Sequence, residues 1–467
     1  MTSTWVQLAY LVAAVCFILA LKGLSSPKTA RTGNLVGAAG ALLACVTVFF
    51  AEDVDHLPLI LVAIAVGSVI GVVGAQRVQM TQMPQLVALF NGVGGGAAAL
   101  VALLELHNLA TVDQAAAGVG GSVPVFHLVA TAFTVLVGSV SFSGSLVTFG
   151  KLQDLLPTRP ITFPGLPVIF GGSLLAAIAL SVVLVASPAM WAGIVLAVVG
   201  LGLGLLLVLP VGGADVPIVI SLLNAFTGLT VAAGGYVLGN TLLLVAGTLV
   251  GASGTLLTKL MAAAMGRSLG NILFGALRGG STLGSTDLSD RPVRSGSPED
   301  IAILLGYAKR VIVVPGYGLA VAQAQHTLRD LVEALEEREI GVEYAIHPVA
   351  GRMPGHMNVL LAEAQVPYEQ LKEMNDINGE FKQTDVVLVV GANDVVNPAA
   401  KTTPSAPIYG MPILAADEAR QVVFLKRSMR PGFAGIENEL LFDPKTTLLF
   451  GDARDTLGKL LAAVRAL

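Results

Sequence analysis

The sequence predicts a membrane domain of about nine helices, followed by a C-terminal α/β domain with a doubly wound, Rossmann-like and mainly parallel sheet. Apolar stretches fill roughly the first 265 residues, and strand-like runs alternate with helical patterns over roughly the last 170. Of the 467 residues, 54% are hydrophobic and only 12% are charged, unlike a soluble protein. We therefore predict a transmembrane domain (1–265), a linker with the domain entry (266–300) and a cofactor-binding domain (301–467).

Each predicted span has about the 20 mostly apolar residues that a helix needs to cross a bilayer. Proline, serine and glycine interrupt the apolar runs where turns are expected. The predicted spans are 4–22, 34–51, 57–75, 85–105, 124–149, 167–187, 190–209, 215–238 and 241–264. Cys16 and Cys45 lie inside these spans as packing residues do, so we expect neither a disulfide nor a metal site.

The basic residues orient these spans. Alternate connections carry lysine or arginine, namely Lys22, Lys28, Arg31, Arg77, Lys151, Arg159, Lys259 and Arg267. The other connections carry only acidic charges, at Glu52, Asp53, Asp55, Glu105 and Asp113. Because basic loops stay in the cytoplasm, we predict a multi-pass protein of the inner (cytoplasmic) membrane, with its N-terminus outside and its C-terminal domain in the cytoplasm. The net charge of −4 gives no sign of nucleic-acid binding.

Few polar residues fall at mid-membrane depth. No Asp, Glu, Lys or Arg lies there, where ionisable groups usually mark ion paths. Asn91, Asn224 and a ladder of serines at 139, 141, 143 and 145 do. Close helix packing is the favoured interpretation of the serines, whereas Asn91 and Asn224 stay open between packing and a proton path. His127, near the outer end of its span, fits an interfacial side chain better than a relay.

The C-terminal part alternates predicted strands with predicted helices. The expected strands cover 310–315, 342–347 and 386–390, with shorter apolar runs at 412–414, 421–425 and 446–450. The expected helices cover 319–338, 357–364 and 453–467. This alternation is the pattern of a parallel, doubly wound sheet.

The turn after the first strand reads Gly316-Tyr317-Gly318. Its glycines would let the backbone approach a pyrophosphate at the start of a helix. The third fingerprint position is Val321, and no acidic residue ends the second strand. The absence of this acidic residue disfavours NAD, because in NAD-binding domains such a carboxylate binds the ribose 2′-hydroxyl. This turn alone leaves a dinucleotide site and an ordinary turn both open.

Two later loops also follow predicted strands directly. Lys426, Arg427 and Ser428, with Arg430 close behind, offer cations and a hydroxyl to a phosphate, and a solvated basic turn is the alternative. Gly391-Ala392-Asn393-Asp394 follows another strand. Because parallel sheets bind ligands at the carboxyl ends of their strands, the loops predict one site at one edge.

Four motifs resemble a known family. GYGLAVAQAQ at 316–325, HPVAGRMPGHMNVLLAEA at 347–364, GANDVVNPAA at 391–400 and KRSMRPGFAGIEN at 426–438 resemble the β subunit of proton-translocating, Re/Si-specific NAD(P) transhydrogenase. The resemblance covers essentially the whole chain. It implies that the C-terminal domain binds NADP(H), that the membrane part conducts protons, and that hydride passes directly between NADP(H) and NAD(H). It also implies a reversed NADP orientation, which explains why the phosphate-binding cations come late in the chain.

The resemblance also implies which residues contact NADP(H). Together with the glycine turn, these are Gly316, Tyr317, Gly318, Val349, Ala350, Gly351, Arg352, Met353, Pro354, Gly391, Ala392, Asn393, Asp394, Val395, Gly410, Met411, Lys426, Arg427, Ser428, Met429, Arg430, Pro431, Gly432, Phe433, Asp452 and Ala453. The family commonly has tyrosine where Phe433 stands, so a hydroxyl contact is missing there. Because hydride transfer needs no general acid or base, we expect Asp394 to couple nucleotide state to the membrane part.

The resemblance implies a partner, because the chain carries no second dinucleotide motif. We expect α subunit or subunits that hold NAD(H) and add membrane helices, in a dimer of the complete assembly within the lipid bilayer. Many members have a proton-relaying histidine after the stretch MPQLVALF (83–90), where this chain has Asn91. In part of the family a partner's helix supplies that histidine, and we expect this arrangement, with Asn91 and Asn224 along the proton path.

Two other functions remain as alternatives. An NADP-regulated transporter or channel without hydride chemistry would need charge-bearing broken helices or a filter loop. A membrane dehydrogenase that reduces a quinone would need a second redox carrier. The sequence shows none of these features.

Overall fold

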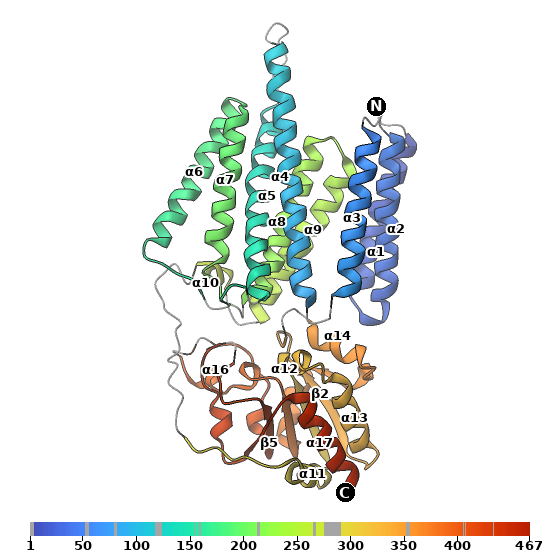
Figure 1. The fold of residues 1–467 in the computed structure, drawn as a ribbon, viewed down its shortest axis with the longest axis vertical. Helices are drawn as coiled ribbons and strands as arrows, with labels where there is room; N and C mark the ends of the chain where they lie inside the picture. Colours follow the sequence, from blue (N-terminus) through green and yellow to red (C-terminus); the bar gives the residue numbers. More distant parts are fainter. Residues whose placement is uncertain are drawn as a thin grey trace. The chain divides into compact units, whose positions relative to one another are not determined.

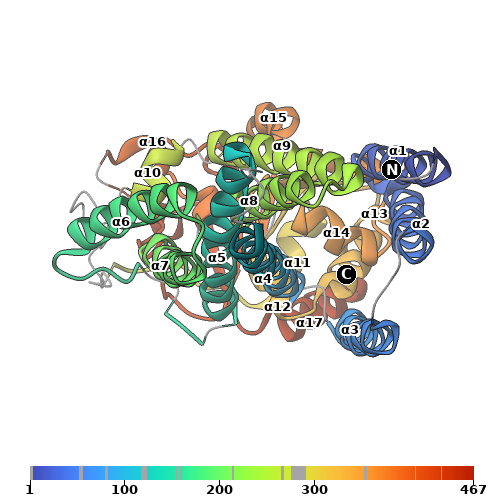
Figure 2. The same ribbon diagram turned by 90° about the horizontal axis from the view of Figure 1, so that it is seen from above.

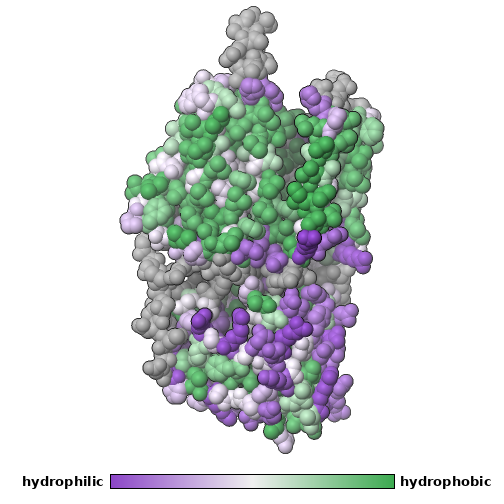
Figure 3. Space-filling view, in the orientation of Figure 1, coloured by the Kyte–Doolittle hydropathy of each residue, from purple (hydrophilic) through white to green (hydrophobic). Residues whose placement is uncertain are grey.

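The computed structural model describes residues 4–51, 56–78, 82–116, 124–153, 155–157, 160–212, 215–264, 268–274, 291–351, 355–404, 406, 408–432 and 434–467. The chain divides into two compact units. The helical unit comprises Met1–Gly212 and Ile218–Lys259, and the sheet unit comprises Gly213–Pro217 and Leu260–Leu467. Apolar side chains dominate the visible surface of the helical unit, whereas the sheet unit shows many hydrophilic ones (Figure 3).

The described residues contain nine helices that are long and apolar enough to cross a membrane (Figure 1). They are α1 (Thr4–Leu24), α2 (Pro27–Ala51), α3 (Leu57–Arg77), α4 (Met83–Ala116), α5 (Val125–Leu152), α6 (Leu166–Ala186), α7 (Met190–Val208), α8 (Val216–Val237) and α9 (Thr241–Ala264). The predicted nine-helix membrane architecture is therefore confirmed, although α2 begins earlier and α4 ends later than predicted.

Helix α5 is central in the helical unit, between α4, α7 and α8 (Figure 2). Small residues allow this packing: a Cβ on Gly138 would fall 2.7 Å from the Gly95 carbonyl oxygen of α4. Helix α3 is the opposite case, because none of its residues is buried. Its apolar side chains are left for lipid or for another protein to cover.

Lys151 differs from its prediction as part of a basic connection. It lies in the last turn of α5 and is fully buried. Its Nζ donates hydrogen bonds to the carbonyl oxygens of Val208 at 3.1 Å, Leu209 at 2.7 Å and Val211 at 2.6 Å. The last carbonyls of a helix lack partners within that helix and carry partial negative charge. The Lys151 ammonium therefore caps the end of α7.

The sheet unit contains a parallel sheet of six strands in the order β3-β2-β1-β4-β5-β6. The strands are β1 (Arg310–Pro315), β2 (Gly341–Ile346), β3 (Leu371–Glu373), β4 (Val386–Val390), β5 (Gln421–Lys426) and β6 (Thr446–Phe450). The predicted doubly wound parallel fold is confirmed. The winding reverses between β1 and β4, and ligands bind at such a switch point in open parallel sheets.

Alternating side chains of the central strands build a core on each face of the sheet. Val311 and Val313 point to one face, and Ile312 and Val314 point to the other. The first face is covered by α11 (Pro298–Gly306), α12 (Tyr317–Val321), α13 (Gln325–Glu336), α14 (His356–Glu363) and α17 (Ala453–Ala466). The second face is covered by α15 (Met374–Ile377) and by loops. The unit also contains two short helices, α10 (Leu269–Phe274) and α16 (Ala399–Thr402).

Several elements differ from the prediction, and α11 and α15 were not expected as helices. The single helix expected at 319–338 is two helices, because Gln323 has a left-handed φ of 48° and separates α12 from α13. Strand β3 was not predicted, since Leu-Lys-Glu carries no apolar alternation. The apolar run at 412–414 is not a strand of the sheet; Leu414 N donates instead to the Val395 carbonyl at 2.9 Å.

Candidate functional site

The glycine turn after β1 packs backbone to backbone against the loop after β4. Gly316 N donates to the Val390 carbonyl and Gly318 N to the Gly391 carbonyl, each at 2.9 Å. A side chain on Gly316 would collide with the Ala392 backbone, and Gly391 has a φ of 72°. Glycine is therefore required for these loops to meet, at the switch point of the sheet.

The loop after β5 folds over the loop after β4. Lys426 Nζ donates to Asn393 Oδ1 at 3.1 Å and to the Arg430 carbonyl at 3.3 Å. Asp394 Oδ2 accepts a bond from Ala434 N at 2.9 Å. Burial lowers the pKa of Lys426, an effect that the nearby Asp394 charge opposes. Lys426 thus holds the loop after β5 against the loop after β4, and its positive charge is only partly balanced by Asp394.

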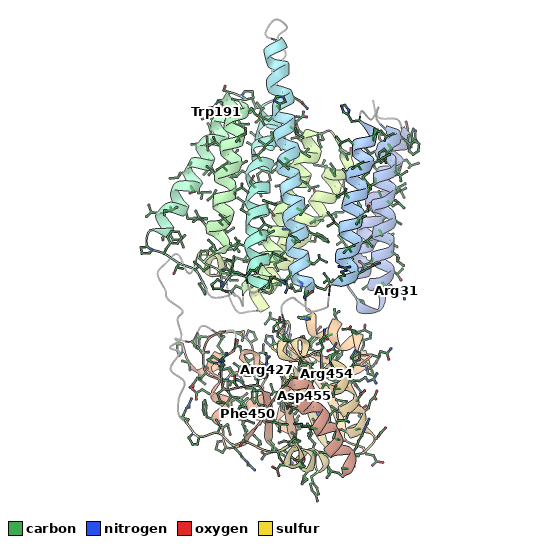
Figure 4. The ribbon with its side chains drawn as sticks, viewed as in Figure 1. Arg31, Trp191, Arg427, Phe450, Arg454 and Asp455 are labelled. Atoms are coloured by element: carbon green, nitrogen blue, oxygen red, sulfur yellow. The ribbon has the colours of Figure 1, made fainter. Side chains whose placement is uncertain are left out.

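Three further cations and a hydroxyl of this region face solvent. Arg427, Ser428 and Arg430 are exposed after β5, as is Arg454 in the first turn of α17. The end of β6 lies beside them, since Gly451 N donates to the Lys426 carbonyl at 3.0 Å. Figure 4 shows Arg427 and Arg454 in the sheet unit. Sequence reasoning missed Arg454, although its position four residues after the end of β6 was a usable signal.

Asp452 and its neighbours form the start of α17. Asp452 Oδ1 accepts a bond from Arg454 N at 3.0 Å and so caps the helix. This cap orients the first turn, where free backbone N–H groups and the positive end of the helix dipole favour anions. Ala453 is the first residue of the helix.

A buried histidine connects the loop after β2 with the segment at 410–412. His347 Nδ1 accepts from Val349 N at 3.2 Å, and Nε2 lies 2.8 Å from the Pro412 carbonyl. Burial lowers the pKa of His347, which favours the neutral ring that these two contacts require. The histidine therefore brings Val349, Ala350 and Gly351 close to Met411.

Two buried asparagines that sequence reasoning missed join the loop after β4 to the segment after β5. Asn438 Nδ2 donates to the Asn393 carbonyl at 3.0 Å, and Asn397 Nδ2 donates to the Glu437 carbonyl at 2.9 Å. Asn438 is 1% exposed and Asn397 0%. Both lie inside the quoted motifs, but an amide gives no local sign of a contact 40 residues away.

The predicted contacts thus fall into three groups. The loops of Gly316–Gly318, Gly391–Val395, Lys426–Gly432 and Asp452–Ala453 follow β1, β4, β5 and β6 at one sheet edge. Val349–Gly351 and Gly410–Met411 are joined through His347. Arg352, Met353, Pro354 and Phe433 lie outside the described residues.

Comparison with known proteins identifies the family. The model of the NAD(P) transhydrogenase beta subunit matches residues 6–463. The chain belongs to this family. Two curated relatives named NAD(P) transhydrogenase subunit beta, both from Rhodospirillum rubrum and one from a named strain, are 47% identical over 466 residues. These alignments cover 99% of this chain and 100% of each relative. The family resemblance of the four motifs is confirmed.

Membership in the transhydrogenase beta family has direct consequences. The chain is a subunit of an oxidoreductase that works with nicotinamide nucleotides, and it has an alpha subunit as its partner. The nine membrane-capable helices within the described part of the chain, together with the family, identify a multi-pass membrane protein.

The helical unit of this transhydrogenase subunit holds a polar cluster around Asn91. Asn91 Nδ2 donates to Ser145 Oγ at 3.0 Å and lies 3.3 Å from Ser141 Oγ. Ser141 Oγ lies 2.6 Å from Thr227 Oγ1 and donates to the Leu223 carbonyl at 3.0 Å. The cluster joins α4, α5 and α8.

The predicted serine ladder therefore splits between two faces of α5. Ser141 and Ser145 belong to the Asn91 cluster, whereas a Cβ on Gly200 of α7 would fall 2.9 Å from Ser139 Cβ, and Ser143 lies against Gly204. Asn224 forms no hydrogen bond with any described residue, so none joins it to the Asn91 cluster.

Proposed function

We propose that this chain is the NADP(H)-binding, proton-conducting subunit of a Re/Si-specific transhydrogenase. The observation that carries the proposal is the convergence of the cationic loops after β5 and β6 with the glycine loops after β1 and β4. Residues 301–467 bind NADP(H), residues 1–265 conduct protons, and residues 266–300 connect them. An NADP-regulated transporter without hydride chemistry is the alternative.

Within this proposal the exposed Arg427 and Ser428 bind the 2′-phosphate, and Lys426 supports them from beneath. A phosphate fits here, because burial lowers the pKa of Lys426 and a nearby negative charge would raise it again. The close backbones of Gly316 and Gly391 give the pyrophosphate access to N–H groups. The nucleotide supplies the hydride chemistry, and the chain supplies binding and orientation.

The alpha partner holds NAD(H), adds membrane helices and supplies the titrating histidine of the proton path. The unburied helix α3 supports additional coverage by protein as well as lipid. We place the assembly, as a dimer, in the inner membrane with the N-terminus of this chain outside. The direct test is proton-coupled hydride exchange between NADPH and an NAD analogue in liposomes that hold this chain and its partner. The proposal would be contradicted by hydride exchange without proton movement, or by the absence of both hydride exchange and proton movement.

Asp394→Asn should leave folding intact but lower proton-coupled turnover about tenfold or more. The amide oxygen can still accept the Ala434 N–H, whereas the charge is lost together with the bond that Asp394 Oδ1 accepts from Asn393 Nδ2 at 3.0 Å. The coupled rate and its pH dependence are measured in liposomes. Asp376→Asn, at an exposed position on α15, is the matched control. A variant with an unchanged rate and pH profile would remove Asp394 from the coupling mechanism.

Asn91→Leu should lower coupled reverse transhydrogenation on the order of tenfold, with NADP+ affinity unchanged, because the contacts to Ser141 and Ser145 disappear. Asn224→Ala should act in the same direction, since an amide without a protein partner is suited to hold water. Rates and affinities are compared in the same preparation. Proton uptake by vesicles that contain this chain alone would show that no partner histidine is needed.

A further inference from the structure

A second polar cluster, this one with titratable groups, lies where α5 begins, at the end predicted to face outside. His127 Nε2 lies 3.8 Å from Glu105 Oε1 of α4. This nitrogen is buried and forms no hydrogen bond with a described residue, since 3.8 Å is too long for one. Tyr236, near the end of α8, has its ring 6.4 Å from the imidazole and 4.9 Å from the Phe126 ring. Three helices thus meet around an imidazole that faces a carboxylate.

The cluster is partly open to its surroundings. The side chain of His127 is 20% exposed and that of Glu105 is 25% exposed. On the helices packed against α5 at this end, the other ionisable residues are the exposed His107 and Tyr236, together with Asp113, which lies on α4 eight residues beyond Glu105. Helices α6 and α7 contain no ionisable side chain at all. Glu105 is therefore the carboxylate that the structure places against His127.

A stripe of buried hydroxyls leads inward from His127. The residues of this stripe are spaced three or four apart and so share one face of α5: His127, Thr131, Thr134, Gly138, Ser141 and Ser145. Thr131 is 0% exposed and Thr134 is 1% exposed. Their hydroxyls donate to the carbonyls of His127 at 2.9 Å and Ala130 at 2.8 Å, which leaves their oxygens able to accept bonds.

The inner end of the stripe is the Asn91 cluster. Ser141 and Ser145 belong to both, and Thr227 of α8 lies 2.6 Å from Ser141. Thr230, one turn further toward the outer end of α8, is also fully buried. The rise from His127 to Ser141 is about 21 Å. Hydroxyl oxygens therefore extend inward from His127 over much of α5, where the helix has no ionisable side chain.

We propose that the His127–Glu105 pair is the proton-exchange site at the outer mouth of the membrane path. His127 Nε2 takes one proton from outside water to give an imidazolium, and the Glu105 carboxylate balances that charge. The same proton then passes inward along the hydroxyl stripe, with water between its members, or returns to the outside. Histidine suits this role because its charge changes between about pH 5 and 8. The inference rests on the proposed proton translocation and on the predicted orientation.

The test uses the complete complex in liposomes, with nucleotides added outside. Only molecules whose nucleotide domains face outward then react, so their outer mouths face the lumen. Lumenal pH is varied between about 5 and 8 at fixed external pH. The coupled rate of the unmodified complex should depend on lumenal pH. His127→Gln should lose that dependence and lower the rate on the order of a hundredfold, the usual contribution of a positioned proton-transfer group.

Two further variants make the test specific. Glu105→Gln should lower the coupled rate by about two- to fivefold, because a partly exposed pair contributes modestly. His107→Gln, an exposed histidine two residues along α4, should behave as the unmodified chain does. NADP+ affinity, measured in the same liposomes, should stay unchanged in all three variants.

The outcomes separate this inference from the proposed function. If the unmodified complex moves protons and His127→Gln keeps the same lumenal pH dependence, the outer site is elsewhere and the inference is overturned. If His127→Gln does not assemble, a Glu105→Gln complex with the rate of the unmodified one overturns it equally. If the unmodified complex exchanges hydride without moving protons, the proposed function itself is wrong.

Discussion

Replacing Lys426 and Arg427 together with alanine should weaken NADP+ binding tens-fold or more and change NAD+ binding little. The two nucleotides differ by the 2′-phosphate, and we propose that Arg427, exposed directly after β5, binds this phosphate. A hydrogen bond to a charged group contributes about 1.5–3 kcal/mol, and each 1.4 kcal/mol is about tenfold in affinity. Calorimetric titration of residues from about 290 to 467 measures both affinities, since this segment contains the whole sheet and both of its cores.

The single variants separate two roles. Arg427→Ala removes an exposed cation and should affect NADP+ alone. Lys426→Ala also releases Asn393 and the Arg430 carbonyl, so it should loosen the loop and slightly weaken both nucleotides. Arg420→Ala is the matched control, because Arg420 pairs with Asp385 at the opposite, amino edge of the sheet. Equal losses for NADP+ and NAD+ in the double variant would place the 2′-phosphate pocket elsewhere.

The sequence predicted the elements whose signal is local. Strand β1 matches its predicted bounds, because five of its six residues are buried and apolar. The break between α12 and α13 could not be predicted, since Ala-Gln-Ala favours helix and only the fold imposes the left-handed Gln323. Strand β3 was missed for the related reason that its pairing with β2, not its own composition, makes it a strand.

The position of the candidate site at one sheet edge could be predicted from the sequence, but the side-chain contacts within it could not. Parallel strands direct their following loops to one edge, so the convergence of the Gly316, Gly391 and Lys426 loops followed from topology. The inward direction of Lys426 did not, because it depends on Asn393 in a distant loop. The same limit applies in the helical unit, where helical periodicity separates the serines into two faces, but only the neighbouring helices decide which face meets Asn91.

Lys151→Ala should destabilise the helical unit by about 3 kcal/mol or more, because three buried hydrogen bonds to a charged group are lost and the last carbonyls of α7 lose their partner. The truncation also leaves a cavity between α5 and the end of α7. Unfolding of the purified complex by denaturant or heat measures the change. Lys22→Ala, at an exposed position in the last turn of α1, is the matched control and should be neutral.

Replacing Lys151 with methionine separates charge from volume. Methionine fills a similar space but donates nothing to the carbonyls of Val208, Leu209 and Val211. A buried charge costs desolvation, so the ammonium stabilises the fold only if its three bonds outweigh that cost. We expect Lys151→Met to be intermediate between alanine and the unmodified chain. A methionine variant as stable as the unmodified protein would mean that the bonds and the desolvation cancel. The lysine would then specify where α7 ends without stabilising it.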